Sequence, residues 1–174
     1  QNTKVNVKVG ADVVVSEPLY PKDGWKNVLA RPNGQLTYQG STYGSLFWEG
    51  YGQGPYPEIT SGTVVPTSQA AATLRSQLAA QGLRGREIDE FMEFWLPHIP
   101  NKPYVRISWL TTAQLNQLAP LTISPKPQTV IRTFLDFEGL DRPATIPEQK
   151  FSAPKRSGFT AVEWGGLLRG GIKH

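Results

Sequence analysis

The most regular pattern of apolar and polar positions lies at the start of the chain. Within residues 4–9, every second position is a valine: Val5, Val7 and Val9. A period of two predicts a β-strand with one buried face. A shorter apolar run at 12–15 predicts a second strand directly after the first.

A β-hairpin is predicted next in the chain. Asn33-Gly34 lies between two apolar stretches, 25–30 and 35–39. This dipeptide is typical of a type I′ turn, in which both central residues have positive φ. A further strand is predicted at 43–49, and a glycine-rich loop follows it.

The pattern becomes helical in the middle of the chain. Apolar residues at helical spacing predict a helical hairpin at about 67–96, and Gly82 occupies the left-handed position that ends its first helix. In the second helix, Glu87, Glu90 and Glu93 are expected to face outward. The hairpin has one strongly apolar face, so it must pack on a sheet.

Strand patterns return in the last part of the chain. Strands are predicted at 104–110, 121–123, 129–138, 158–164 and, more weakly, 146–151, with a short helix at 111–118. In the longest of these strands, Arg132 and Asp136 are expected on the face opposite Leu135 and Phe137, because side chains of a strand alternate between its two faces.

Together these elements predict a β-rich α+β fold. We expect a mostly antiparallel, sandwich-like domain with the helical hairpin as an insert. Residues 17–174 are expected to form a single globular domain. Residues 1–16 are expected to form an N-terminal strand or arm.

Composition narrows the class of protein. The chain has no cysteine, which excludes disulfides, a thiolate nucleophile and a Cys-ligated metal. Its net charge is +4 and its basic residues are scattered, so no nucleic-acid partner is expected. No apolar stretch is long enough for a membrane span. The chain begins at Gln1 rather than Met, as expected of a secreted protein after signal-peptide cleavage.

Several segments, taken in order, carry a resemblance to a known group of proteins. They are Asp23-Gly24-Trp25, Pro32-Asn33-Gly34, Tyr43-Gly44-Ser45-Leu46-Phe47-Trp48-Glu49-Gly50, Phe94-Trp95-Leu96-Pro97, Ile131-Arg132-Thr133-Phe134 and Gly158-Phe159-Thr160-Ala161-Val162-Glu163-Trp164-Gly165-Gly166. This order resembles an uncharacterised domain of predicted secreted and cell-surface proteins of bacteria. The resemblance covers residues 23–166. It implies an extracellular or cell-surface location and carries over no catalytic or binding residue.

Few residues are suited to catalysis. The chain has two histidines, His98 at a predicted helix end and His174 at the last position. Glu49 and Glu163 each lie beside a tryptophan and glycines, where a carboxyl group could act as the acid of a glycosidase. The alternative is that both are polar residues that alternate with buried tryptophans. We favour that alternative and expect no enzyme activity, no cofactor and no metal site.

Aromatic residues around the glycine-rich loop are the candidates for ligand binding. Trp48, Tyr51 and Tyr56 lie in segment 48–57, and exposed aromatic rings on such loops can stack on sugars. The alternative is that these rings cover the edge of a sheet. The first alternative predicts a carbohydrate-binding module for cell-wall or surface sugars.

The N-terminal strand suggests the leading functional hypothesis. Val5, Val7 and Val9 could fill pockets of a neighbouring subunit while the backbone adds a strand to its sheet, as donor strands do in fibres. The alternative is that the strand pairs within its own domain. We therefore expect a structural or adhesive module of the bacterial surface that is the subunit of a filament. Its expected partners are copies of itself or another surface protein.

Overall fold

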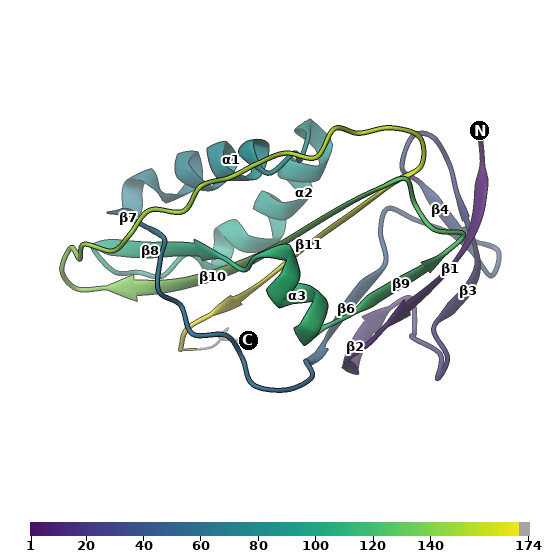
Figure 1. Cartoon of the computed structure of the whole chain (residues 1–174), viewed down its shortest axis with the longest axis horizontal. Coiled ribbons are helices and arrows are strands. Elements are labelled where there is room, and N and C mark those ends of the chain that lie inside the picture. Colours follow the sequence, from purple (N-terminus) through teal and green to yellow (C-terminus); the bar gives the residue numbers. More distant parts are fainter. Residues whose placement is uncertain (171–174) are drawn as a thin grey trace. The chain divides into compact units, whose positions relative to one another are not determined.

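The computed structural model describes residues 1–170, which form two compact units (Figure 1). Unit 1 comprises Gln1–Tyr56 and Ala113–Pro127, and the described part of unit 2 comprises Pro57–Thr112 and residues 128–170. The single globular domain expected from residue 17 stays a prediction. Within unit 1, a segment far along the chain returns to pair with the N-terminal strand, which sequence periodicity does not reveal.

Unit 1 is built from seven short strands. They are β1 (Thr3–Val9), β2 (Asp12–Glu17), β3 (Trp25–Ala30), β4 (Leu36–Tyr38), β5 (Ser41–Tyr43), β6 (Phe47–Tyr51) and β9 (Leu121–Ser124). Five of them form an antiparallel sheet in the order β5-β4-β3-β1-β9, and β2 pairs antiparallel with β6 in a separate two-stranded ribbon. The strand expected at 43–49 is therefore two strands, which belong to different sheets.

The five-stranded sheet buries one face of β1. Val5 and Val9 are 4% exposed, whereas Lys4 and Lys8 on the opposite face are exposed. The period-two pattern thus correctly predicts both the strand and its buried side. Buried residues from β3 and β4 complete this part of the core, namely Trp25, Val28 and Tyr38.

The hairpin at Asn33-Gly34 is present, but its turn differs from the predicted type. Gly34 has φ of +88°, whereas Asn33 is not among the residues with positive φ. The N–H of Gly34 donates to the carbonyl of Arg31, and the N–H of Arg31 donates to the carbonyl of Gln35. Only one left-handed residue is therefore needed to reverse the chain between β3 and β4.

Unit 2 combines a four-stranded sheet with a helical hairpin. Its elements are β7 (Thr63–Pro66), α1 (Ala70–Ala80), α2 (Gly85–Trp95), β8 (Tyr104–Trp109), β10 (Thr129–Leu140) and β11 (Thr160–Leu168), with 3-10 turns at Thr67–Gln69 and Leu96–His98. The sheet order is β11-β10-β8-β7, and only the β10–β11 pair is parallel. A further helix, α3 (Thr112–Leu118), leads into β9. The coarse prediction of a β-rich, mostly antiparallel fold with a helical hairpin is confirmed.

One strand prediction for unit 2 was wrong, and one strand was not predicted. Residues 146–151 form no strand, and β7 was not predicted. Gln149 shows why the first segment stays outside the sheet. Its side-chain amide, rather than its backbone, bonds to both the N–H and the carbonyl of Trp109, at 2.9 and 2.8 Å.

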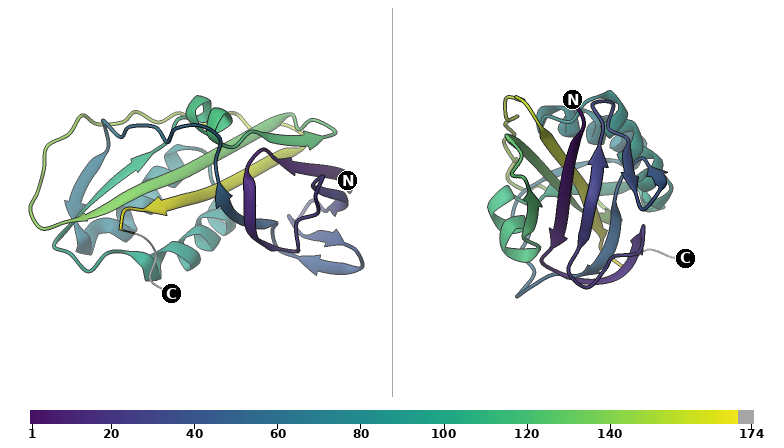
Figure 2. Two further views of the ribbon diagram at one scale, coloured as in Figure 1. Left: turned by 90° about the horizontal axis from the view of Figure 1, so that it is seen from below. Right: turned by 90° about the vertical axis from the view of Figure 1, so that its right-hand side faces the viewer.

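Helices α1 and α2 lie on one face of the unit 2 sheet (Figure 2, left). The centre of this contact is aromatic: the ring of Phe91 lies 5.8 Å from that of Trp109 and 5.5 Å from that of Trp164. Trp95 packs edge-on against Phe137 with ring centroids 5.5 Å apart. The apolar face of the hairpin therefore meets the alternating apolar positions of three strands.

A long connection joins the parallel strands β10 and β11 (Figure 1) and brings Ala153 and Pro154 close to Gly82, just after α1. Parallel neighbours cannot be joined by a tight turn, so a crossover of this kind is required. Arg156 fixes the connection by donating hydrogen bonds to the carbonyl of Gly82 and to the carboxylate of Glu87. Gly82 has φ of +103° and ends α1, as predicted.

We predict that Gly166→Ala destabilises unit 2. A Cβ at Gly166 would lie 2.8 Å from the ring of Trp95 in α2 and 3.1 Å from Leu135 in β10. Either α2 or one of the two paired strands must therefore shift. The expected loss is about 1–3 kcal/mol of unfolding free energy, measured by urea denaturation. The matched control is Gly165→Ala, whose Cβ would be in ordinary contact with Phe134 at 3.5 Å. Equal losses for both variants would contradict the packing described for α2.

Candidate functional site

The ribbon β2–β6 carries the most exposed apolar strand of the described chain. Tyr51 pairs with Asp12, and Glu49 pairs with Val15. Because opposed residues share a face and side chains alternate along a strand, these four side chains lie on one face of the ribbon. Val15 is 50% exposed and Tyr51 is 73% exposed. This face is therefore open to solvent although much of it is apolar.

A β-bulge adds to the exposure of this ribbon. The register shifts between Val13 and Val15, so Val14 is an extra residue, and it is 66% exposed. At Gly50, a Cβ would lie 1.8 Å from the carbonyl oxygen of Asp12, so the close approach of the two strands requires a glycine there. The sequence thus builds an irregular ribbon that presents valines outward.

The outward face of the ribbon is also acidic. Asp12, Glu17 and Glu49 are exposed, and β2 and β6 contain no lysine or arginine. Among the residues that the structure describes, none of these three carboxylates forms an ion pair; every ion pair lies in unit 2. The ribbon therefore has uncompensated negative charge around exposed apolar side chains. We call Asp12, Val14, Val15, Glu17, Glu49 and Tyr51 the ribbon surface.

The three aromatic candidates for ligand binding are not equivalent in the structure. Tyr51 lies on the ribbon surface, whereas Trp48 is half-buried on the opposite face of β6, and Tyr56 is half-buried at the end of the loop. The loop between them is anchored, because the N–H of Gln53 donates to the carbonyl of Leu118 at 2.6 Å. The structure thus exposes one of the three rings widely.

The donor-strand candidates lie in an inner strand. β1 pairs with β3 on one side and with β9 on the other, both in its own chain. Val5 and Val9 are buried in unit 1, and Val7 is half-buried. Donation of this strand to a neighbour stays a prediction, and it would require a neighbour's β1 to occupy the same place between β3 and β9.

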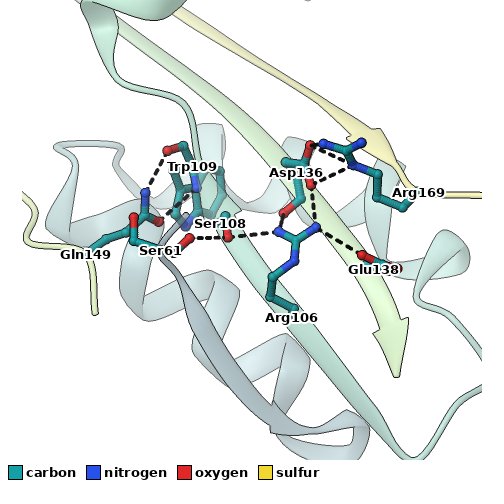
Figure 3. A network of polar contacts seen from close by, with 8 residues as sticks. All are labelled: Ser61, Arg106, Ser108, Trp109, Asp136, Glu138, Gln149 and Arg169. Atoms are coloured by element: carbon teal, nitrogen blue, oxygen red, sulfur yellow. Dashed lines mark hydrogen bonds and ion pairs between the residues drawn. The ribbon is translucent and has the colours of Figure 1, made fainter. Parts of the chain in front are cut away.

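In unit 2, a buried carboxylate organises the face of the sheet opposite the helices (Figure 3). Asp136 has no exposed surface and accepts from Arg106 Nη2 at 2.6 Å and from Arg169 Nη2 at 3.1 Å. Glu138 approaches the same Arg106 at 3.6 Å. Among residues 1–170, two guanidinium groups therefore face two carboxylates, and these four charges balance.

Arg106 also links the network to the neighbouring backbone. Its Nη1 donates to the carbonyl of Asp136 at 3.0 Å and to the hydroxyl of Ser108 at 2.8 Å, and Ser108 donates in turn to the carbonyl of Ser61 (Figure 3). The sequence placed Asp136 on a face opposite the apolar residues, but did not predict that this face is buried. The alternation of Arg106 and Ser108 on the neighbouring strand was the available signal.

A second ion pair, between buried Arg132 and half-buried Glu163, joins the parallel strands. Arg132 and Glu163 are register partners, and Arg132 donates to both carboxylate oxygens of Glu163 at 3.1–3.2 Å. Burial raises the pKa of Glu163, and the guanidinium of Arg132 offsets part of this effect. Glu49, the proposed partner of Glu163 in a glycosidase, lies in unit 1. The side chain of Glu163 is thus engaged within its own sheet.

Glu87 differs from the outward-facing residue that was expected. It accepts from the N–H of Arg84 at the start of α2 and pairs with Arg156. Burial acts to raise the pKa of Glu87, but the hydrogen bonds and charges of Arg156 and Arg84 outweigh it, and the net shift is downward. This carboxylate therefore joins the helical hairpin to the long connection.

The structure describes one of the two histidines. His98 packs near Phe94 and Trp95, with ring centroids 5.5 and 5.9 Å apart, and His174 lies outside the described residues. In the part of the chain from residue 1 to 170, no three metal-ligating side chains come together. A depression of about 530 Å³ that is open to solvent lies in unit 1 and is lined by Lys22, Asp23 and Lys26 among others, but by none of the aromatic candidates.

We predict that Asp136→Asn strongly destabilises unit 2. The substitution leaves two guanidinium groups facing a neutral amide, and breaking a buried pair in this way costs about 3–5 kcal/mol. Urea denaturation followed by tryptophan fluorescence measures the loss. The control is Asp141→Asn, because Asp141 pairs with Lys102 while both side chains are largely exposed. That variant is expected to lose less than about 1 kcal/mol, and a similar loss in both would refute the special role of Asp136.

The pKa of Glu87 predicts a pH dependence of stability. A carboxyl group with a lowered pKa stabilises the folded state above its ordinary value of 4.5, and this contribution is lost as the pH falls below it. Glu87→Gln is therefore expected to cost about 1–3 kcal/mol at pH 7 and less at pH 4. Glu93→Gln, an exposed position on the same helix, is the control. If Glu87→Gln lost as much unfolding free energy at pH 4 as at pH 7, the result would contradict the ion pair with Arg156.

The last two observations concern membrane spans and similarity to known proteins. No helix among residues 1–170 is both long and apolar enough to cross a membrane. Comparison of the chain with family models, with curated proteins and with solved structures gives no match.

Proposed function

We propose that this chain is a non-enzymatic structural or adhesive module of the bacterial cell surface that associates with copies of itself, as the subunit of a filament. The observation that carries the proposal is the ribbon surface. Val14, Val15 and Tyr51 are between 50% and 73% exposed on one short ribbon. Contiguous exposed apolar residues rimmed by polar groups mark interaction sites in soluble proteins.

The polar residues of unit 2 support a structural role. Asp136, Glu163 and Glu87 are each bound by at least one arginine. A carboxylate held by guanidinium donors is a poor acid or base for a substrate, because its lone pairs are already occupied. These groups join strands and helices, and a rigid unit of this kind suits a module that bears or transmits load.

We also propose that unit 1 is a small sandwich. The ribbon turns Val13 and Trp48, both half-buried, to the face opposite the ribbon surface. The five-stranded sheet turns Val5 and Val9 to its own buried side. In addition, the indole N–H of Trp25 in β3 donates to the carbonyl of Pro18, just after β2, at 3.1 Å. Two such layers would place the ribbon surface outward.

Carbohydrate binding is the second candidate function, and Tyr51 is the residue that favours it. An exposed ring can stack on a sugar, but sugar-binding surfaces gain from several rings, and Trp48 and Tyr56 are half-buried. We therefore rank self-association first. Binding of cell-wall polysaccharide that is lost in Tyr51→Ala, in a protein that stays monomeric, would reverse this order.

The proposed function predicts assembly that depends on concentration. Light scattering and negative-stain electron microscopy of the whole chain are expected to show ordered oligomers or fibres. A protein that stays monomeric up to millimolar concentration would contradict the proposal. We expect Val14→Ser to weaken assembly. Unrelated precipitation would lack order and would be the same in the Val14→Ser variant.

A disulfide experiment shows whether strand donation takes part. Asn6 of β1 and Ser124 of β9 are register partners, and the chain has no other cysteine to interfere. We expect Asn6→Cys/Ser124→Cys to form an intrachain disulfide in the assembled material, because β1 is already paired on both sides in its own chain. A ladder of disulfide-linked oligomers on a denaturing gel would show strand donation instead. Asn6→Cys alone is the control.

A further inference from the structure

The two sheets of unit 1 carry opposite charges. The five-stranded sheet contains Lys4, Lys8 and Lys26 and no carboxylate, whereas the ribbon contains three carboxylates and no cation. None of these charged groups forms an ion pair among residues 1–170. In unit 2, by contrast, arginines and carboxylates pair internally. Unit 1 thus presents two unneutralised surfaces of opposite sign.

The charges on the two surfaces have the same spacing. Lys4 and Lys8 lie four residues apart on the exposed face of β1, which corresponds to about 13 Å along a strand. Asp12 and Glu17 are five residues apart, but the bulge at Val14 removes one step. Their partners on β6 are Tyr51 and Phe47, again four residues apart, so the carboxylates are also separated by about 13 Å.

We propose that the ribbon surface of one copy docks on the lysine-bearing face of β1 in a second copy. Lys4 and Lys8 of one chain then meet Asp12 and Glu17 of the other, and the aliphatic stems of the lysines cover Val14 and Val15. The occupant is a second copy because the required basic surface is present in the same unit, with matching spacing and no internal partner. The inference rests on the proposed self-association and adds the contact by which it occurs.

This contact is directional. Two ribbon surfaces facing each other would bring carboxylates together without a cation, and two copies of the β1 face would bring lysines together. The attractive contact therefore joins different surfaces of the two copies. A contact of this heterologous kind leaves one surface of each type free at the ends, so it repeats into a ring or an open filament.

A charge-exchange experiment tests the contact in the whole chain. We expect Lys4→Glu/Lys8→Glu and Asp12→Lys/Glu17→Lys each to weaken assembly at least about tenfold in the concentration required, because each replaces attraction by repulsion. An equimolar mixture of the two variants restores both contacts and is expected to assemble. The control is Arg142→Glu/Lys150→Glu, which changes the net charge as much as the first variant at exposed positions of unit 2. It is expected to assemble like the original chain.

The outcomes separate the contact from the proposed function. Assembly of the original chain that is unaffected by either variant overturns the contact and leaves self-association standing. Loss in both variants without recovery in the mixture also overturns it, and circular dichroism shows whether those variants are folded. An original chain that is monomeric by sedimentation at low and at high salt overturns the proposed function together with the contact. Salt that weakens assembly of the original chain supports the contact, because exposed charges are screened.

Discussion

The burial of one carboxylate constrains most of unit 2. Asp136 has no contact with solvent, and a charge in that position is tolerated only if it is paired and hydrogen-bonded. Arg106 comes from β8 and Arg169 follows the end of β11, so the compensation of a single side chain on β10 connects three strands. The parallel β10–β11 pair carries a second such tie at Arg132 and Glu163. On the opposite face the same strands are fixed by aromatic packing against α2, which leaves the sheet little freedom to change register.

The two units use charge in different ways. In unit 2, charged side chains stabilise the fold: arginines pair with carboxylates across strands, and Arg156 binds the long connection to Glu87. In unit 1, order comes from apolar burial around Trp25 and Val28 and from backbone pairing, and its charged side chains form no ion pair among the described residues. Charge that does not stabilise the fold is available for recognition, which is why we place the interaction surfaces in unit 1 and the scaffold in unit 2.

Much of the local structure could be predicted from the sequence, because its signals are local. Alternation predicted β1 and its buried side, and Gly82 predicted the end of α1. The pairing of strands could not be predicted in this way: the parallel neighbour of β10 and the return of β9 to β1 depend on contacts between distant residues. The same limit applied to the sites. Asp136 was placed on the correct face, but its burial depends on Arg106 and Arg169, which are distant in the sequence. Tyr51 was identified from its loop, whereas the exposure of Val14 depends on a bulge.

The carboxylates of the ribbon have a second effect besides attraction. Val13 to Val15 is a run with high β-propensity at the edge of a two-stranded sheet, and such a run without flanking charge is prone to pair with any other exposed strand. Asp12 and Glu17 bracket the run and oppose pairing with apolar or acidic strands, while the bulge disturbs the regular edge. The surface is therefore selective because it is acidic: only a partner that brings cations at the right spacing lowers the electrostatic cost of covering the valines. A lysine-bearing strand meets this condition, and an exposed hydrophobic edge does not.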